Sequence, residues 1–178
     1  MTALPKEPMT DRSADIDALA RRVEAMEDRW QILELLSAYG PAVDSGSADV
    51  AADLWLDDGV YDVDSGMLRG RAGLRAMIEG DMHQGFIRNG SAHLMGIPHI
   101  VLDGDRAIVT GHSQLVLKVS DGPEFAVARI TANRWELVKI DGRWRVERRI
   151  ARLLDGRAEA RALLAALGTV ESGTVDDR

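Results

Sequence analysis

Residues 97–154 read IPHIVLDGDRAIVTGHSQLVLKVSDGPEFAVARITANRWELVKIDGRWRVERRIARLL, and this stretch decides the fold class. Apolar and polar residues alternate along most of it, which is the two-residue period of a half-buried β-strand. Asp-Gly pairs at 103–104, 121–122 and 141–142 separate the β-rich runs, and Asp-Gly is a strong signal for a tight hairpin turn. The stretch therefore predicts four long antiparallel strands in meander order.

A helical period precedes the sheet. Apolar residues recur at steps of three and four, and so predict an amphipathic helix, at Ile16, Leu19, Val23, Met26, Trp30 and Leu33. This helix is expected to run to about Tyr39, where Gly40 and Pro41 bend or interrupt it.

Shorter elements connect the long helix to the meander. Ser47 is expected to cap a short helix over 49–55, residues 59–70 (GVYDVDSGMLRG) predict a hairpin, and residues 71–80 (RAGLRAMIEG) predict a third helix. A last amphipathic helix is predicted over 156–167. Helices first and an antiparallel sheet second indicate an α+β fold with the helices on one face of the sheet.

The length of 178 residues is that of one domain with a core large enough to hold a pocket. We expect a flexible arm at 1–12, a single domain at 13–167 and a flexible tail at 168–178.

Composition excludes several classes of function. A net charge of −7 argues against a nucleic-acid partner, because binding phosphates needs a basic surface. The chain has no cysteine, which excludes thiol catalysis and thiolate metal sites, and no glycine-rich phosphate loop, which leaves no sequence evidence for a nucleotide cofactor. No apolar run approaches the length of a membrane span and the N-terminus lacks the apolar core of a secretory signal, so a cytoplasmic protein with no membrane partner is expected.

Three residues could carry acid–base chemistry: Tyr39, Asp44 and His93. A neutral imidazole is available as a base near pH 7, and a carboxylate bonded to one ring nitrogen would hold its tautomer. A phenol could protonate a departing oxygen. Each residue also has an ordinary structural interpretation, Asp44 as a turn residue and the other two as core side chains. If Asp44 and His93 form a site, their side chains should meet within hydrogen-bonding distance.

The late strands place two polar residues on an apolar face. If 141–142 is a two-residue turn, Ile140 pairs with Arg143, so that Asn133 falls opposite Ile150 and Thr131 opposite Arg152. Thr131 and Asn133 then share the inward face with Val127, Trp135, Trp144 and Val146. They either bond to backbone and water or line a pocket. The same register puts Arg148 and Arg152 on the inner face.

The remaining histidines are weaker candidates. His83 lies in a polar stretch, 81–90, that we expect to form a loop near a pocket mouth with an exposed imidazole. His99 and His112 lie in predicted strands without an obvious carboxylate neighbour, and Gly96 and Pro98 break any metal-ligand spacing with His93. No metal is expected.

Four segments together resemble the SnoaL-like branch of the nuclear transport factor two-like superfamily: LLSAYGPAVDSGSADVAADLWLDDGVYDV (35–63), SAHLMG (91–96), VLDGDRA (101–107) and TANRWELVKIDGRWRV (131–146). The resemblance covers about residues 25–155. It implies a cone-shaped α+β barrel, in which a strongly curved, mostly antiparallel sheet wraps around three helices and leaves a deep pocket; here an N-terminal helical extension is added. The superfamily includes enzymes and binding proteins, so its fold alone does not decide function.

The pattern is closest to scytalone dehydratase and bile-acid dehydratase. Both are similar to this chain in an Asp at the end of the first helix and a His opening the first long strand, which match Asp44 and His93. Tyr39 and Tyr61 resemble two tyrosines of the bile-acid enzyme. Thr131 and Asn133 resemble a hydroxyl residue and an Asn of scytalone dehydratase. The second histidine of scytalone dehydratase has no clear match.

The resemblance and the trio together favour a cofactor-independent lyase, a dehydratase acting on a hydrophobic hydroxylated carbonyl compound that is polycyclic, steroid-like or aromatic. Tyr39, Asp44 and His93 would be catalytic, and Tyr61, Thr131, Asn133 and Arg152 would bind substrate. The alternatives are a double-bond isomerase like ketosteroid isomerase and a non-catalytic small-molecule-binding module. Because the apolar stripe Ile16–Trp30 has no obvious partner within the domain, a homo-oligomer, a dimer or trimer, is also expected.

Overall fold

The structure is a computed structural model that describes residues 12–119 and 122–167. Its helices are α1 (Arg12–Asp44), α2 (Ala48–Asp53), α3 (Gly70–Glu79), α4 (Asp81–Asn89) and α5 (Ala158–Ala165). Its strands are β1 (Trp55–Val63), β2 (Gly66–Arg69), β3 (Ser91–Met95), β4 (His99–Asp103), β5 (Arg106–Lys118), β6 (Phe125–Ile140) and β7 (Arg143–Leu153). The expected arm up to residue 11, the expected tail and Asp121 lie outside the described residues, and Arg12 already begins α1.

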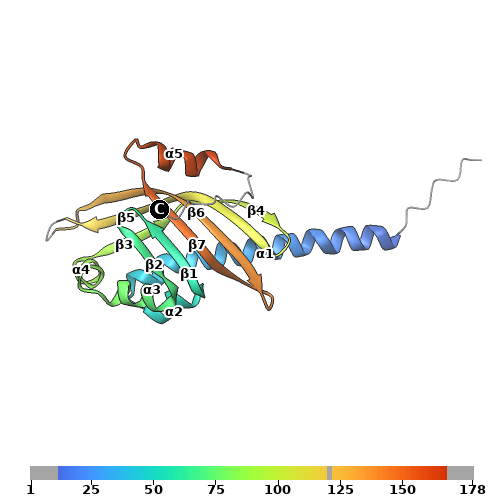
Figure 1. Cartoon of the computed structure of the whole chain (residues 1–178), viewed down its shortest axis with the longest axis horizontal. Helices are drawn as coiled ribbons and strands as arrows, with labels where there is room; N and C mark the ends of the chain where they lie inside the picture. The colour runs from blue at the N-terminus through green and yellow to red at the C-terminus, as the bar shows by residue number, and fades with distance from the viewer. Residues whose placement is uncertain (1–11, 120–121, 168–178) are drawn as a thin grey trace, which may run out of the picture.

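The strands form one curved, unclosed sheet in the order β2-β1-β7-β6-β5-β3, with β4 also paired to β5 (Figure 1). The pairs of the meander β4–β7 are antiparallel, as predicted, and among the described strands only β1 and β7 run parallel. The predicted α+β fold, a curved sheet wrapped around helices, is confirmed.

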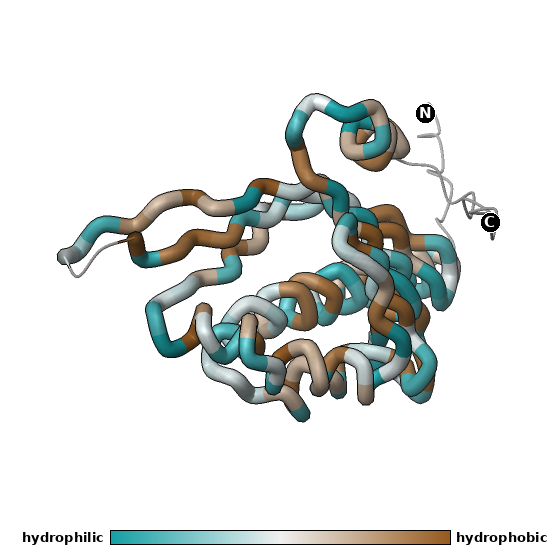
Figure 2. The backbone as a smooth tube through the Cα atoms, turned by 60° about the vertical axis from the view of Figure 1, so that its left-hand side comes forward, coloured by the Kyte–Doolittle hydropathy of each residue, from teal (hydrophilic) through white to brown (hydrophobic). Residues whose placement is uncertain are grey.

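Helices cover both faces of the sheet, not one as predicted. Helices α1 to α4 lie on the concave side, whereas α5 lies on the opposite side against β6 and β7 (Figures 1 and 2). The chain turns out of β7 at Gly156, whose φ of 96° is readily adopted only by glycine. Ala160 of α5 is then buried against the sheet. The interior that holds the candidate site is therefore the α1 side alone.

The first helix does not end near Tyr39. It continues through Pro41 to Asp44, and the Ser45 N–H still bonds to the Pro41 carbonyl at 3.0 Å. Proline removes only the bond to the carbonyl four residues earlier, that of Ser37, and Ser37 is exposed. Ala42 and Val43 are buried in the core, and this packing holds the last turn in place.

Gly40 lets the end of α1 lie directly on β3. A Cβ at Gly40 would stand 2.3 Å from the carbonyl oxygen of His93, closer than any real contact. Only a glycine permits this approach. Since Asp44 is four residues further along the same helix face, the approach carries its carboxylate to the start of β3.

The N-terminal half of α1 projects from the domain (Figure 1). The apolar side chains of the predicted stripe from Ile16 to Trp30 are each 45–68% exposed, so the domain does not cover them. None of the helices in the described part of the chain is both long and apolar enough to cross a membrane.

A β-bulge in β7 shifts the predicted register by one residue. Ile140 does pair with Arg143, but the pairing moves between Leu137↔Val146 and Glu136↔Arg148, which leaves Glu147 as an extra residue. Asn133 consequently lies opposite Ala151, not Ile150, and Thr131 opposite Leu153, not Arg152.

The bulge also reverses which side chains of β7 face inward. Trp144 and Val146 before it are buried as predicted, but beyond it Arg149 and Ala151 take the inner face in place of Arg148 and Arg152. A second irregularity, between Leu115 and Val116, lies beside Val127. Val127 was predicted to face inward, but it is half exposed.

The stretch predicted as a loop at 81–90 is helix α4. His83 is not exposed but buried, with 5% of its surface accessible. The polar residues around His83 gave no sign of its burial. Only one face of α4 packs against the domain, and Met82 on another face is exposed.

Candidate active site

Asp44 and His93 meet, as the sequence predicted. The Nδ1–H of His93 donates to Asp44 Oδ1 at 2.7 Å, and the backbone N–H of His93 donates to Asp44 Oδ2 at 2.6 Å. The Ser91 hydroxyl also donates to Oδ1, at 3.3 Å. Asp44 thus fixes the imidazole and the backbone of β3 at once.

This arrangement determines the tautomer of His93. A carboxylate only accepts hydrogen bonds, so the proton lies on Nδ1 and Nε2 of the neutral ring carries the lone pair. The His93 and Asp44 side chains are 22% and 21% exposed, which leaves the imidazole within reach of a small molecule. Burial lowers the pKa of His93 below its ordinary value, although Asp44 opposes the shift. The ring is therefore a neutral base at pH 7.

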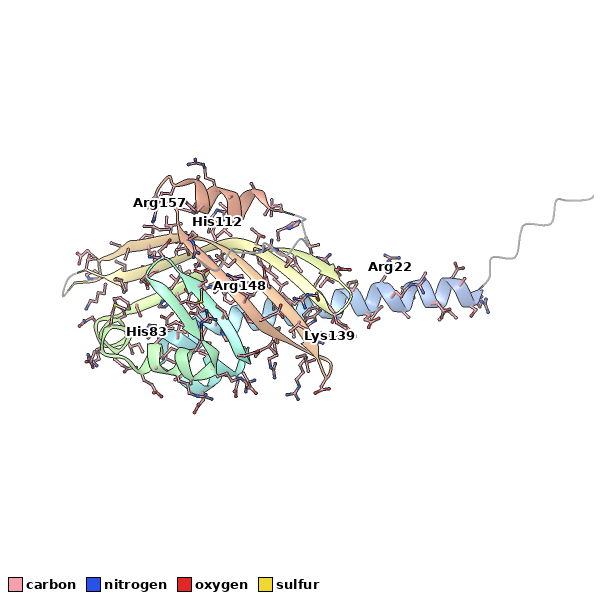
Figure 3. The ribbon with its side chains drawn as sticks, viewed as in Figure 1. Arg22, His83, His112, Lys139, Arg148 and Arg157 are labelled. Carbon is pink, nitrogen blue, oxygen red and sulfur yellow. The ribbon has the colours of Figure 1, made fainter. Side chains whose placement is uncertain are left out.

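His83 lies against the base. Its ring stacks on that of His93, with centroids 5.5 Å apart and planes inclined by 24°. The His83 Nε2–H donates to the carbonyl of Val43 at 2.9 Å, one residue before Asp44. His83, which comes from α4 (Figure 3), therefore connects the end of α1 to the face of the base.

Arg149 is the functional candidate that the sequence interpretation missed. It is 3% exposed, and its guanidinium carbon lies over three aromatic rings, at 4.2 Å from Trp135, 4.6 Å from Tyr61 and 4.7 Å from Tyr39. Cation–π contacts of a desolvated guanidinium contribute roughly 2 kcal/mol. No carboxylate of the described residues forms an ion pair with Arg149, and its Nη1 has no hydrogen-bond partner. A buried positive charge with an unused donor is an anion-binding feature.

A polar network holds Arg149 in place. Its Nε and Nη2 both donate to Asn133 Oδ1, at 3.0 and 2.8 Å. The Asn133 amide donates to the Ser113 hydroxyl at 2.9 Å, and Ser113 bonds to the Thr131 hydroxyl at 2.7 Å. Asn133 and Thr131 face inward as predicted but are fully buried. Asn133 also donates to the backbone carbonyl of Thr131, at 3.2 Å. The two residues therefore bond within the sheet and orient Arg149.

Tyr39 and Tyr61 belong to the aromatic cluster around Arg149. Tyr39 contacts Trp135 edge-on at 5.7 Å, and Tyr61 lies 5.8 Å from Trp55, whose buried Nε1–H has no partner. Burial raises the pKa of Tyr39 above its ordinary range, with Arg149 opposing the shift. Tyr39 is therefore a neutral phenol that can donate a hydrogen bond but does not act as an anionic base.

Arg152 does not join the other predicted site residues. It forms an ion pair with Asp62 at 2.8 Å, and Arg148 bonds to the same carboxylate at 3.5 Å. Arg152 and Asp62 line a cavity of about 430 Å³ beneath α5, on the other side of the sheet from His93. The β-bulge at Glu147 places the Arg152 side chain on this outer face of the sheet.

The sequence contained one signal for Arg149. Because strand side chains alternate, one of the adjacent residues Arg148 and Arg149 must face inward in either register. His83 offered no comparable signal. Among the residues that the structure describes, no three His, Asp or Glu side chains gather closely enough to hold a metal ion.

Comparisons with known proteins agree with the fold. The model of the SnoaL-like domain family matches residues 24–150. An NTF2-like protein with a cystatin-like fold from Novosphingobium aromaticivorans is 41% identical, with a TM-score of 0.79, over 82% of this chain and 94% of that one. No curated protein matches the chain.

Two more distant structures share the fold. A hexachlorocyclohexane dehydrochlorinase from Novosphingobium barchaimii is 17% identical, with a TM-score of 0.65, over 75% of this chain and 90% of that one. A candidate scytalone dehydratase from N. aromaticivorans is 19% identical, with a TM-score of 0.62, over 72% and 85%. The family model matches well over half of the described residues, and the chain belongs to the SnoaL-like domain family.

Proposed function

We propose that this protein is a cofactor-independent lyase that removes water from a hydrophobic β-hydroxy carbonyl compound. The observation that carries the proposal is the bond between His93 Nδ1 and Asp44 Oδ1, because it leaves Nε2 free as a neutral base. A pure binding protein has no need of an imidazole oriented in this way.

The reaction can be written with these groups. Nε2 of His93 takes the proton from the carbon next to the carbonyl, and the electrons of that C–H bond move onto the carbonyl oxygen as an enolate. Asp44 stabilises the imidazolium that results. The enolate then collapses, the carbon–carbon double bond forms, and the β-hydroxyl leaves as water. It takes the proton of His93 either directly or through Tyr39, which gives up its own proton and receives that of His93.

Arg149 supplies the stabilisation of the enolate in this proposal. Its unpaired Nη1 is a charged donor in a desolvated aromatic surrounding, where an interaction with a developing oxyanion is stronger than in water. The Nε1–H of Trp55, in the same cluster, is a second unused donor. The aromatic rings favour a polycyclic or aromatic substrate.

A panel of aromatic and polycyclic β-hydroxy ketones tests the proposal, with the enone product followed by its ultraviolet absorbance. We expect turnover by the wild type, and a loss of about 10⁴-fold for Asp44→Asn, which favours the wrong tautomer of His93. Migration of a double bond without loss of water would identify an isomerase, since that reaction begins with the same proton abstraction. Binding without turnover on every compound would identify a non-catalytic module and reject the proposal.

A further inference from the structure

Helix α1 has two apolar faces, and its own domain covers only one. The covered face includes Ile32, Leu35, Leu36, Tyr39 and Val43. The second face is the exposed stripe Ile16–Trp30, which lies on the opposite side of the helix from the buried residue Asp28. An apolar stripe of this length on a helix that projects from the domain requires a partner.

The stripe has the seven-residue period of a coiled coil. Its first core positions are Ile16, Val23 and Trp30, and its second core positions are Leu19, Met26 and Leu33. β-Branched residues at the first position with leucine-like residues at the second favour two-stranded pairing. The pattern thus points to a second helix of the same kind, which a second copy of the chain supplies.

The charges beside the stripe select the orientation of that pair. In a parallel coiled coil, the residue directly before each first core position lies beside a residue of the partner helix whose number is five higher. Arg22 then meets Glu27 of the second copy. Arg29 donates through Nη1 to the Ile100 carbonyl of its own domain at 2.8 Å, and its remaining donors face Glu34 of the second copy. In an antiparallel pair, Arg22 would instead face an arginine, Arg22 or Arg29, of the second copy. Arg22 lies on the projecting part of α1, where it is free to make such a contact (Figure 3).

The stripe continues onto the surface of the domain. A groove of about 690 Å³ is lined by Trp30, Leu33, Ser37, Met95, Ile97 and Pro98, among others, and Ile97 is almost fully exposed. In a parallel pair both domains stand at the same end of the coil, and the two grooves face each other across the two-fold axis.

We propose that α1 pairs with α1 of a second copy as a parallel, two-stranded coiled coil that holds two domains side by side. The proposal is independent of the proposed enzymatic activity, because the hydrogen bonds of His93, Asp44 and Arg149 in the described part of the chain involve no residue of the stripe.

Single cysteines test this directly, since the chain has none of its own. In a parallel pair every core position faces itself, so Ile16→Cys and Val23→Cys should both form disulfide-linked dimers under mild oxidation. In an antiparallel pair two Ile16 positions lie about 15 Å or more apart, beyond the roughly 7 Å limit for a disulfide. Arg21→Cys, on the opposite side of the helix, is the control and should not cross-link.

Mass measurement and a charge exchange complete the test. Sedimentation should give twice the chain mass of 19.4 kDa. Arg22→Glu should weaken the dimer at least several-fold, and Arg22→Glu with Glu27→Arg should restore it. Cross-linking of Val23→Cys alone would reject the parallel orientation. A single-chain mass, a trimer, or cross-linking of Arg21→Cys as efficient as that of Ile16→Cys would overturn the proposal.

Discussion

His83 and His93 lie face to face, with their ring centroids 5.5 Å apart. The pKa of His93 is lowered first by burial, and then by the charges of His83 and Arg149, while Asp44 raises it. In His83→Phe the aromatic stack remains but one lowering charge is lost, so the pKa of His93 should rise. Titration of the His93 imidazole by NMR measures this without a substrate. His99→Phe, at an exposed position of β4, should leave the titration unchanged. Identical titrations of wild type and His83→Phe would contradict the coupling.

The lowered pKa of His93 also predicts how stability depends on pH. The unfolded chain binds a proton at His93 near pH 6.5, whereas the folded chain binds it only at lower pH. This contribution to the free energy of unfolding is therefore present above pH 6.5 and is lost as the pH falls through the folded pKa. Urea unfolding at pH 7.5 and pH 5 should show a larger loss for wild type than for His93→Gln. Equal losses would mean that His93 has an ordinary pKa.

Gly40 is expected to be irreplaceable for steric reasons. Its Cβ would stand 2.3 Å from the His93 carbonyl, so Gly40→Ala must separate α1 from β3. Overpacking of this kind costs roughly 1–3 kcal/mol of stability and would lengthen the Asp44–His93 bond. Gly73→Ala in α3 is the matched control, because a Cβ there meets atoms no closer than 3.7 Å, and it should be neutral or slightly stabilising. Urea unfolding of the two variants decides the matter, and equal stabilities would contradict the steric argument.

Arg149 should matter for activity more than for stability. Arg149→Met keeps an apolar chain among Tyr39, Tyr61 and Trp135 but removes the donor proposed for the enolate. We expect kcat to fall about 10²–10³-fold. Stability should fall by roughly 1–3 kcal/mol, because buried Asn133 Oδ1 loses its two donors, and the protein should still fold. Arg143→Met, at an exposed position of β7, should keep full activity. Circular dichroism of both variants establishes that each is folded.

The sequence predicted the parts of this fold that depend on local signals. The Asp-Gly turn at 141–142 and the alternation of β4 to β7 were sufficient for the meander, and the meeting of Asp44 with His93 followed from their proposed roles. The inner face of β7 could not be read correctly, because one extra residue, Glu147, reverses every side chain after it. That single bulge explains why Arg152 was expected in the site and Arg149 was not.

Tertiary packing decided the other differences. Pro41 stays helical because Ala42 and Val43 are held in the core, and no local propensity reports that. His83 is buried because α4 lies against the end of α1, where the Val43 carbonyl accepts its Nε2–H. In both cases the deciding contacts join segments that are far apart in the sequence.

The most direct test of the proposed reaction follows the first proton. Wild type and His93→Ala are incubated in D₂O with β-hydroxy ketones that ligand-observed NMR has first shown to bind. The wild type should exchange or eliminate the proton next to the carbonyl, and His93→Ala should slow this step by about 10²–10⁴-fold, the usual contribution of a general base. Equal rates for the two proteins, or no exchange and no elimination by the wild type on any ketone that it binds, would contradict the assignment of His93 as the base.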